Sequence, residues 1–165
     1  MKNIKILIAT HKPHVMPSNT EIYFPIYVGS EGKEDIGYCR DNTGENISTL
    51  NPFYSELTGL YWAWKNLEFD YLGLVHYRRY FTKNTRRYYE GINIDEVVLT
   101  KEQIESLLNN NQVIVPKKRN YYIETLYSHY DHTFDGKHLD IARKIIEKET
   151  PEYLSSFDKV MKQRS

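Results

Sequence analysis

Two apolar segments separated by one predicted helix constrain the fold of this chain most strongly. Residues 4–10 are β-branched and apolar with polar flanks, and residues 71–76 form a second, mostly apolar run. Such runs are typical of strands buried on both faces of a parallel sheet. Residues 51–66 carry apolar side chains at steps of three and four, which predicts a helix that starts at Asn51-Pro52. A strand–helix–strand unit favours parallel pairing of its strands.

The remaining segments extend this order. Residues 30–48 are polar and contain glycine, so we expect a long exposed loop there. Further strands are expected at 23–28, as an edge strand that tolerates Pro25, and at 112–115. Four further helices are expected. One follows a capping box at 100–103, and the others lie at 123–130, at 139–148 and from Thr150-Pro151 to 161. The fold class is therefore α/β, a layered fold with a mostly parallel central sheet flanked by helices.

Length and cysteine content narrow the class of protein. A chain of 165 residues with 40% hydrophobic residues suits one globular domain. Its single cysteine, Cys39, has no partner for an internal disulfide, which favours a reducing compartment. The apolar run near Met1 is about five residues, shorter than the roughly seven of a signal peptide. We therefore expect a cytoplasmic protein, soluble or peripheral to a membrane.

The balance of charge indicates a local anion site. Lys+Arg and Asp+Glu are both 22, so there is no overall basic field to attract polyanions. Three of the four expected strands nevertheless run into basic residues: His11-Lys12, Arg78-Arg79 and Lys117 to Arg119. Because the carboxyl ends of parallel strands meet at one edge of a sheet, these groups would form a concentrated positive site. A nucleotide diphosphate is a natural ligand for such a site.

Neighbouring side chains at the second strand end are expected to differ in role. If the strand continues through Arg78 and Arg79, their side chains point to opposite faces, so one would bind ligand and the other a carboxylate. His76 closes an apolar strand, and we interpret it as a hydrogen-bonded core histidine rather than a catalytic base. Trp64 belongs to the apolar helical stripe, whereas Trp62 does not and is expected to be exposed.

Several common site motifs are absent from the sequence. It has no GxxxxGK[ST], GxGxxG, GxSxG or HExxH string. A cluster of histidines and aspartates could hold a metal, but its spacing matches no standard helix-borne pair, and a polar surface explains it more simply. The members of this cluster are His129, Asp131, His132, Asp135 and His138.

Longer strings resemble a known family. They are 41–48 (DNTGENIS), 51–66 (NPFYSELTGLYWAWKN) and 73–81 (GLVHYRRYF), together with 8–12 and 122–127. The chain is similar over nearly its whole length to the bacterial capsular and exopolysaccharide glycosyltransferase family first described as a domain of unknown function. The resemblance implies a GT-A-like fold and transfer of a sugar from a nucleotide-sugar donor, in assembly of surface polysaccharide at the cytoplasmic face of the membrane.

A hypothesis for the site follows from the strand ends and this resemblance. The donor would bind against residues at the strand ends and at the start of the first helix, namely Thr10, His11, Lys12, Asn46, Ser48, Asn51, His76, Tyr77, Arg78 and Arg79. The base of an inverting transfer would be Asp41, Glu56 or Asp131, among which the sequence does not choose. No Asp-x-Asp motif follows the second strand, so Arg and Lys could neutralise the phosphates, and a divalent metal stays open.

Members of the family that this chain resembles usually continue for several tens of residues beyond the position of its last residue. We therefore expect one glycosyltransferase-like domain over 1–165 that lacks its C-terminal portion. Its partners would be a nucleotide-sugar donor and a lipid-linked or growing glycan acceptor, without nucleic acid. The main alternative is a non-catalytic nucleotide- or glycan-binding fragment of such an enzyme. A nucleic-acid binder that uses stacking tyrosines with Arg86, Arg87 and the basic run 117–119 ranks last.

Overall fold

The computed structural model describes residues 2–82, 91 and 93–164. These residues form two compact units, Met1–Ile114 and Val115–Ser165, here called unit 1 and unit 2. Each unit is described by itself. Among the described residues, no helix combines the length and apolar character needed to cross a membrane.

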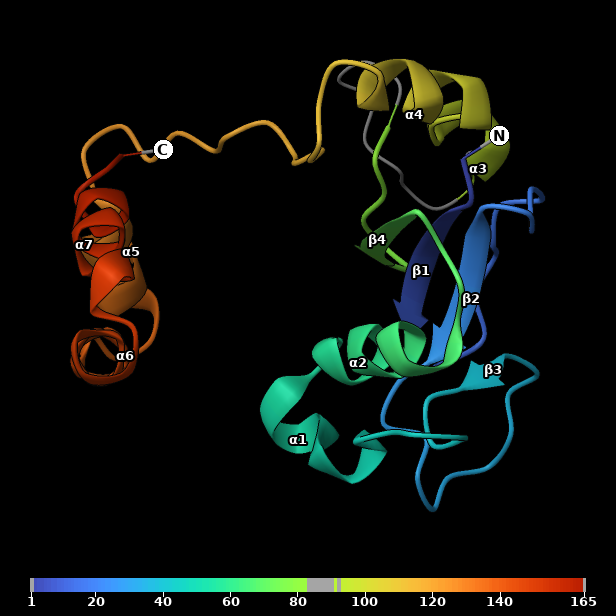
Figure 1. Ribbon diagram of the computed structural model, residues 1–165, viewed down its shortest axis with the longest axis horizontal. Coiled ribbons are helices and arrows are strands. Elements are labelled where there is room, and N and C mark those ends of the chain that lie inside the picture. Colours follow the sequence, from blue (N-terminus) through green and yellow to red (C-terminus); the bar gives the residue numbers. More distant parts are fainter. Residues whose placement is uncertain (1, 83–90, 92, 165) are drawn as a thin grey trace. The chain divides into compact units, whose positions relative to one another are not determined.

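Unit 1 is organised around a parallel sheet of four strands (Figure 1). The strands are β1 (Ile4–Thr10), β2 (Tyr23–Tyr27), β3 (Cys39–Arg40) and β4 (Tyr71–His76), in the spatial order β3-β2-β1-β4. In β1, Ile8 pairs with Pro25 of β2 on one side and with Val75 of β4 on the other. The predicted strands 4–10 and 71–76 and the parallel α/β class are confirmed. The prediction that β2 is an edge strand is wrong, because β3 forms within the expected loop and pairs with Ile26 and Tyr27.

The predicted helix over 51–66 is divided in two. A short η1 (Ser48–Leu50) leads into α1 (Asn51–Tyr54), and α2 (Leu57–Asn66) follows after a break. Ser55 at the break has φ 49° and ψ −128°, outside the helical region. Asn51 starts α1 as expected, but its side chain does not cap the helix.

Helix α2 contacts the sheet through its small residues. Thr58, Gly59 and Ala63 are buried, and a Cβ added to Gly59 would lie 2.8 Å from Val28 Cγ1. The predicted orientation of the two tryptophans is wrong: the exposed fraction is 6% for Trp62 and 62% for Trp64. Small side chains let the helix backbone approach the sheet closely. Leu57 and Trp64 of the predicted stripe therefore face outward, whereas its Leu60 and Leu67 are partly buried against the core.

Successive side chains of β1 pack in two separate hydrophobic cores, because side chains alternate between the two faces of a strand. Leu7 and Ala9 pack with Ile26, Trp62 and Ala63 on the α2 side. On the other face, the even-numbered residues of β1 pack against α3 (Ile94–Val97) and α4 (Lys101–Leu108). The predicted capping box is confirmed, since Thr100 and Gln103 satisfy each other's backbone amides at the start of α4.

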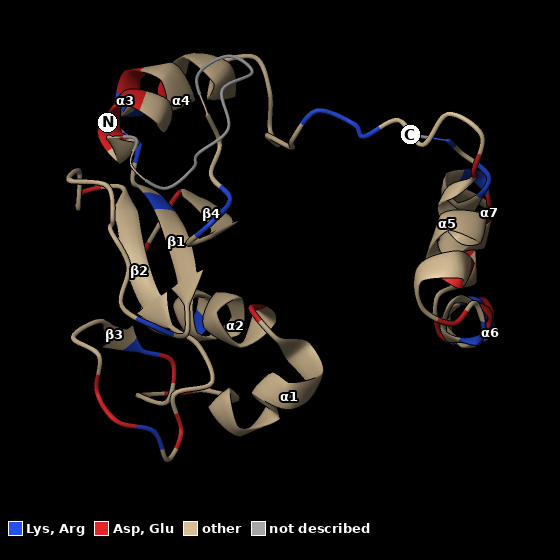
Figure 2. Cartoon of the chain, turned by 180° about the vertical axis from the view of Figure 1, so that it is seen from behind, with Lys and Arg blue, Asp and Glu red and all other residues tan. Residues whose placement is uncertain are grey.

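The predicted strand 112–115 is absent from the structure. These residues have no regular secondary structure, and Val113 and Val115 are each 72% exposed. A four-residue run stopped by Pro116 offers few backbone hydrogen bonds to a ladder. The basic run 117–119 therefore follows no strand, and it lies in the segment that precedes the helices of unit 2 (Figure 2).

Unit 2 is helical, and its three predicted helices are confirmed with shifted ends. They are α5 (Leu126–Thr133), α6 (Lys137–Glu149) and α7 (Leu154–Met161), the last preceded by η2 (Pro151–Tyr153). Arg143 of α6 binds Asp158 of α7 through two hydrogen bonds of 2.8 and 2.9 Å. This forked ion pair connects the two helices.

Candidate functional site

A cavity of about 330 Å³ opens where β1, β2 and β4 of unit 1 end. This is the edge at which ligands bind in open parallel sheets. Figure 1 shows α1 and α2 beside the carboxyl ends of β1 and β2. Nine residues line the cavity: Thr10, His11, Tyr27, Val28, Lys33, Asn51, Ser55, Glu56 and His76.

Four of the ten residues predicted to bind the donor line this cavity: Thr10, His11, Asn51 and His76. Thr10 is buried, and its hydroxyl donates to the carbonyl of Lys12 at 2.6 Å while it accepts from the Lys12 amide at 3.3 Å. This local turn sets the direction in which the chain leaves β1. The imidazole of His11 is exposed at the cavity.

The ring of Tyr77 gathers cationic groups beside the cavity. It is 2% exposed, with the Lys12 ammonium 5.6 Å and the Arg78 guanidinium 5.1 Å from the ring centroid. The rings of His11 and His76 lie 5.4 and 4.3 Å from it. Cations are attracted to the face of an aromatic ring, so Tyr77 holds Lys12 and Arg78 near the strand ends.

A tight turn follows β4. The His76 amide donates to the Arg79 carbonyl at 3.2 Å, and the Arg79 amide donates to the His76 carbonyl at 2.7 Å. The strand therefore ends at His76, and the condition for alternating faces at Arg78 and Arg79 is not met. Both arginine side chains are exposed.

His76 and Glu56 face each other across the cavity. His76 Nδ1 accepts from the Arg78 amide at 3.3 Å, and Nε2 lies 4.0 Å from Glu56 Oε1. Burial lowers the pKa of His76 below its ordinary 6.5; Glu56 opposes this shift, while Arg78, His11 and Arg79 reinforce it. At neutral pH the ring is uncharged, and the bond at Nδ1 places its proton on Nε2, toward Glu56.

Asp41, predicted as one possible base, is fully buried and does not line the cavity. Its carboxylate accepts five hydrogen bonds, from the Gly29 and Ser30 amides and from the hydroxyls of Ser30, Ser48 and Thr58. Burial alone would raise its pKa, but the hydrogen bonds from Ser30, Ser48, Thr58 and Gly29 hold the pKa below its ordinary value. An acceptor hydroxyl has no access to this carboxylate, so Asp41 is removed from the candidate bases.

Asn46 and Ser48 lie away from the cavity wall as well. The Ser48 hydroxyl is buried, donates to Asp41 Oδ1 at 2.5 Å and accepts from the Glu31 amide. The Asn46 side chain bonds within its own loop, to the Gly44 carbonyl and the Ser48 amide. Both residues shape the loop before α1 instead of presenting free groups to a donor.

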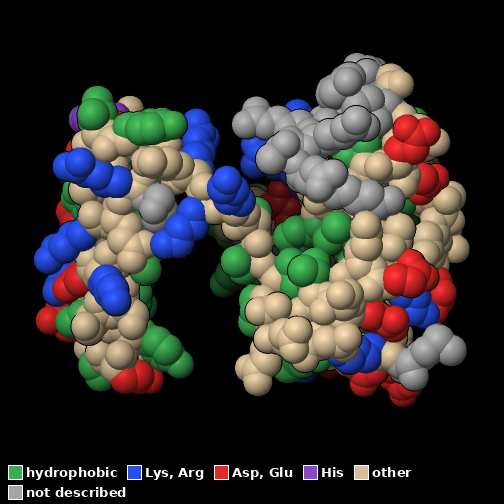
Figure 3. All heavy atoms as spheres, turned by 90° about the horizontal axis from the view of Figure 1, so that it is seen from above, with side chains coloured by type: hydrophobic (Ala, Val, Ile, Leu, Met, Phe, Trp, Pro, Cys, Tyr) green, Lys and Arg blue, Asp and Glu red, His purple; other side chains and the backbone are tan. Residues whose placement is uncertain are grey.

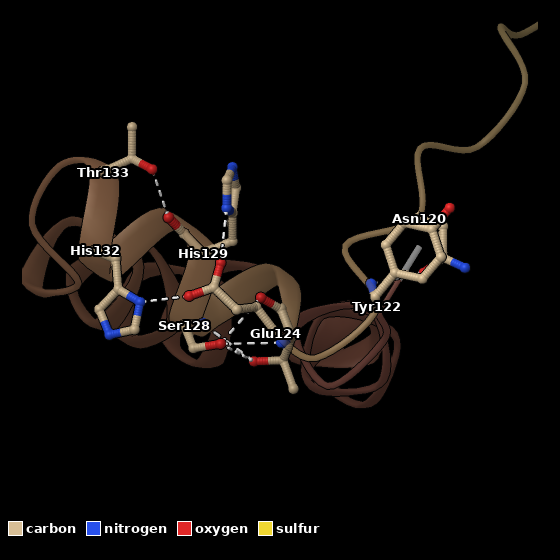
Figure 4. Close-up of polar contacts among 8 residues, drawn as sticks. Asn120, Tyr122, Glu124, Ser128, His129, His132 and Thr133 are labelled. Carbon is tan, nitrogen blue, oxygen red and sulfur yellow. Dashed lines mark hydrogen bonds and ion pairs between the residues drawn. The ribbon is translucent and has the colours of Figure 1, made fainter.

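Asp131 belongs to unit 2, where its carboxylate accepts from the Gly136 amide at 2.8 Å. Nearby, Glu124 binds both His129 Nδ1, at 3.0 Å, and His132 Nδ1, at 2.5 Å (Figure 4). Within the described parts of the chain, no group of three or more His, Cys, Asp or Glu side chains is arranged to hold a metal ion.

Lys33, Tyr27 and Ser55 are cavity residues that the sequence reasoning missed. Tyr27 ends a strand, so the rule for parallel sheets could have found it. The segment between β2 and α1 carries both basic and acidic residues (Figure 2). Lys33 is one of its charges, and its ammonium lies 5.9 Å from the Tyr27 ring centroid. Ser55 reaches the cavity because the helix breaks there, which its sequence does not signal.

A second cavity of unit 1, of about 280 Å³, lies among β1, β4 and α4. Its described lining is apolar except for Gln112, as the side chains of Ile6, Leu74 and Ile104 illustrate. It lacks the convergent polar groups of the cavity at the strand ends, which is therefore the stronger candidate.

Comparison with known proteins identifies the family of this chain and a solved structure of similar fold. Residues 5–165 match the family described as domain of unknown function DUF4422. The chain belongs to this family. No curated protein matches it. It is similar to the apo structure of WbbM, described as a bifunctional glycosyltransferase, with 30% identity and a TM-score of 0.82.

That similarity covers 98% of this chain and 32% of the WbbM chain, so this chain spans about a third of the length of that protein. This similarity shows that the chain has a glycosyltransferase-like fold and that its family is glycosyltransferase-like. It confirms the α/β class predicted from the strand and helix order and the GT-A-like fold that the family resemblance implied.

Proposed function

We propose that this chain transfers a sugar from a nucleotide-sugar donor to a polysaccharide acceptor, in capsule or exopolysaccharide assembly. The observation that carries the proposal is the cavity at the carboxyl ends of three parallel strands. It combines His11 and Lys33 in its wall with Lys12 and Arg78 beside it. Cations grouped in this position suit the diphosphate of a nucleotide sugar.

The donor diphosphate would lie against Thr10 to Lys12 on one side and Arg78 and Arg79 on the other. Both arginine side chains are exposed, so their guanidinium groups are available to phosphate oxygens. When the bond between sugar and phosphate breaks, negative charge grows on the leaving diphosphate. Cations fixed beforehand stabilise that charge in the transition state.

Glu56 is the candidate base that the cavity favours. Among the three predicted bases, it alone lines the cavity, where its carboxylate faces His76. In an inverting transfer, a base removes the proton of the acceptor hydroxyl as the oxygen attacks the anomeric carbon. The His76 imidazole, with its proton on Nε2, would orient the Glu56 carboxylate.

A divalent cation is a separate question for assay. Among the nine residues that line the cavity, Glu56 is the one with a carboxylate. In phosphate sites, Mg²⁺ is bound by one or two carboxylates together with phosphate oxygens. Turnover measured with added Mg²⁺ and with EDTA determines the dependence.

The proposal is tested by calorimetry and by turnover with a panel of nucleotide sugars. Arg78→Ala and Arg79→Ala should each weaken donor binding about tenfold, because each removes a charge-assisted hydrogen bond. Lys12→Ala should do the same, whereas Lys5→Ala, at the opposite end of β1, is the matched control. Unchanged affinity in both arginine variants would show the phosphate assignment to be wrong.

A non-catalytic nucleotide- or glycan-binding module is the second candidate. In this case the cavity at the strand ends would hold a donor or a glycan without sugar transfer. The two functions differ in the release of nucleoside diphosphate from a bound donor. Binding without release, with and without a glycan acceptor, would favour the module.

The acceptor would be a lipid-linked or growing glycan, with the protein at the cytoplasmic face of the membrane. Exposed aromatic side chains close to the cavity support a sugar acceptor. Phe53 is 83% and Tyr54 49% exposed, and both lie between the cavity residues Asn51 and Ser55 in the chain. Aromatic faces of this kind stack on sugar rings.

Nucleic acid is disfavoured as a partner. Arg86 and Arg87, which entered that hypothesis, lie outside the described residues. Figure 3 shows Lys and Arg side chains at several places on one face of unit 2, some of them close together, with tan surface around most of them. Strong salt dependence of binding to an oligonucleotide would revive this function.

A further inference from the structure

The backbone of Ser55 is strained, and it lies directly before Glu56. Its φ of 49° falls in the left-handed region, which residues with a Cβ seldom occupy. Such strain persists only where the surroundings hold it in place, and it is most frequent at functional sites. Ser55 lines the cavity and separates α1 from α2.

Asn51 holds this strained backbone. Its Nδ2 donates to the Ser55 carbonyl at 2.7 Å and to Thr58 Oγ1 at 3.1 Å, while its own carbonyl accepts from the Ser55 amide at 2.8 Å. Gly29 presses against the same side chain, since a Cβ at position 29 would lie 2.4 Å from Asn51 Cγ. The amide of Asn51 therefore has little freedom to turn away.

Thr58 connects Asn51 to the buried carboxylate. Its hydroxyl accepts from Asn51 Nδ2 and donates to Asp41 Oδ2 at 2.6 Å. Asp41 is in turn fixed by the Gly29 and Ser30 amides at the end of β2 and by Ser48. A continuous chain of hydrogen bonds thus runs from the sheet to the Ser55 carbonyl.

We infer that Asp41 and Thr58 are positioning residues, which act through Asn51 to hold the strained Ser55 backbone and so aim Glu56 across the cavity at His76. This inference rests on the proposed function, in which Glu56 is the base. It assigns a role in the reaction to Asp41, a carboxylate that touches no substrate.

The test removes one hydroxyl. Thr58→Val deletes the donor to Asp41, the acceptor for Asn51 and a direct hydrogen bond of 3.1 Å to the Ser55 carbonyl at nearly constant volume, and Thr58→Ser restores all three. If the valine variant does not fold, Thr58→Ala is the second variant, because alanine leaves space for a water beside Asp41. Thr49→Val, an exposed threonine in η1, is the matched control, and circular dichroism verifies the fold of each variant.

The first measurement needs no substrate: the pKa of His76 followed by NMR. The groups that face His76 are Glu56, Arg78, His11 and Arg79, of which only Glu56 raises its pKa. If Thr58→Val lets Glu56 move away from His76, the pKa of His76 should fall, as it should in Glu56→Gln. Thr58→Ser and Thr49→Val should leave it at the wild-type value.

The second measurement is turnover. Thr58→Val should lower kcat about tenfold with little change in KM for the donor, and Thr58→Ser should recover kcat. Ser55→Gly in the Thr58→Val background should also recover it, because glycine adopts this backbone without strain.

An unchanged His76 pKa in Thr58→Val, alongside a fall in Glu56→Gln, would overturn the inference. So would an unchanged pKa in Glu56→Gln, since Glu56 would then not face His76. Failure of the proposed function can be told apart from failure of this inference. If the proposed function is wrong, the wild-type protein neither binds nor turns over a nucleotide sugar, while the NMR measurement of the His76 pKa stays valid.

Discussion

Asp41 shows how one buried charge can organise a loop. Its carboxylate collects donors from β2, from the loop before α1 and from α2, so three separate segments meet at two oxygen atoms. A buried carboxylate is costly unless its lone pairs are satisfied, and here five donors satisfy it. Removing its charge should therefore affect stability before it affects chemistry.

Asp41→Asn should lower the free energy of unfolding at pH 7 by about 3 kcal/mol, because an amide nitrogen would face backbone and hydroxyl donors. The folded pKa of Asp41 lies below its ordinary 3.8, so its stabilising contribution is present above that pH and is lost as pH falls through the folded value. The difference in free energy of unfolding between wild type and Asp41→Asn should therefore become smaller below about pH 4.

Urea unfolding at several pH values measures this gap. Asp35→Asn is the control, since Asp35 is exposed and accepts from the Gly37 amide alone among the described hydrogen bonds. A gap of constant size from pH 7 to pH 3 would contradict the expected linkage.

At the level of single site residues, the sequence identified polar groups at strand ends but not their accessibility. Thr10, His11 and His76 reach the cavity because β1 and β4 end where the residue patterns predict. Ser48 and Asp41 were expected to face ligand, and both are buried in one network. Burial of a polar side chain depends on donors that arrive from distant segments, which local patterns do not reveal.

Helix α2 illustrates why an apolar stripe can mislead. The sequence has two faces able to contact a sheet: a bulky stripe with Leu57 and Trp64, and a small face with Gly59 and Ala63. The small face prevails because it allows close approach to Ile26 and Val28. Trp62 lies on this face, stacked at 6.0 Å on Phe24 and bonded to the Thr43 carbonyl.

Trp62→Ala should therefore cost about 3–5 kcal/mol, through the cavity and the lost hydrogen bond. Trp64→Ala should change the free energy of unfolding by less than about 0.5 kcal/mol, because its side chain is largely in water. Chemical denaturation measures both, and each variant serves as the control of the other.

Fluorescence of the same variants provides a second measurement. Iodide should quench the emission that Trp64 contributes far more than the emission from Trp62. The reverse order of quenching, or equal destabilisation by the two substitutions, would contradict the orientation of α2.

At the scale of the whole molecule, the chain consists of an α/β unit that contains the candidate site and a helical unit that follows it. Residues 112–120 between the last helix of unit 1 and the first of unit 2 have no regular structure. Lys117, Lys118 and Arg119 are exposed there. An exposed segment of this kind fits readily into the site of a protease.

Limited trypsin digestion of the native chain should therefore cut after these basic residues earlier than within α2, α4 or α6. Mass spectrometry of early fragments measures the order of cleavage. Lys101 and Lys144, which lie within helices, are the internal controls. Cleavage at these two sites before the 117–119 segment would contradict the expectation.

The sequence by itself determined the α/β class, both strands around the first crossover, the capping box of α4 and the edge of the sheet where the site would form. These features depend on local periodicity, capping residues and the geometry of parallel strands. Only the tertiary structure decided the break at Ser55, the face of α2 that meets the sheet, the burial of Asp41 and the meeting of Glu56 with His76. Each depends on groups distant in the chain that compete for the same space or the same hydrogen bonds.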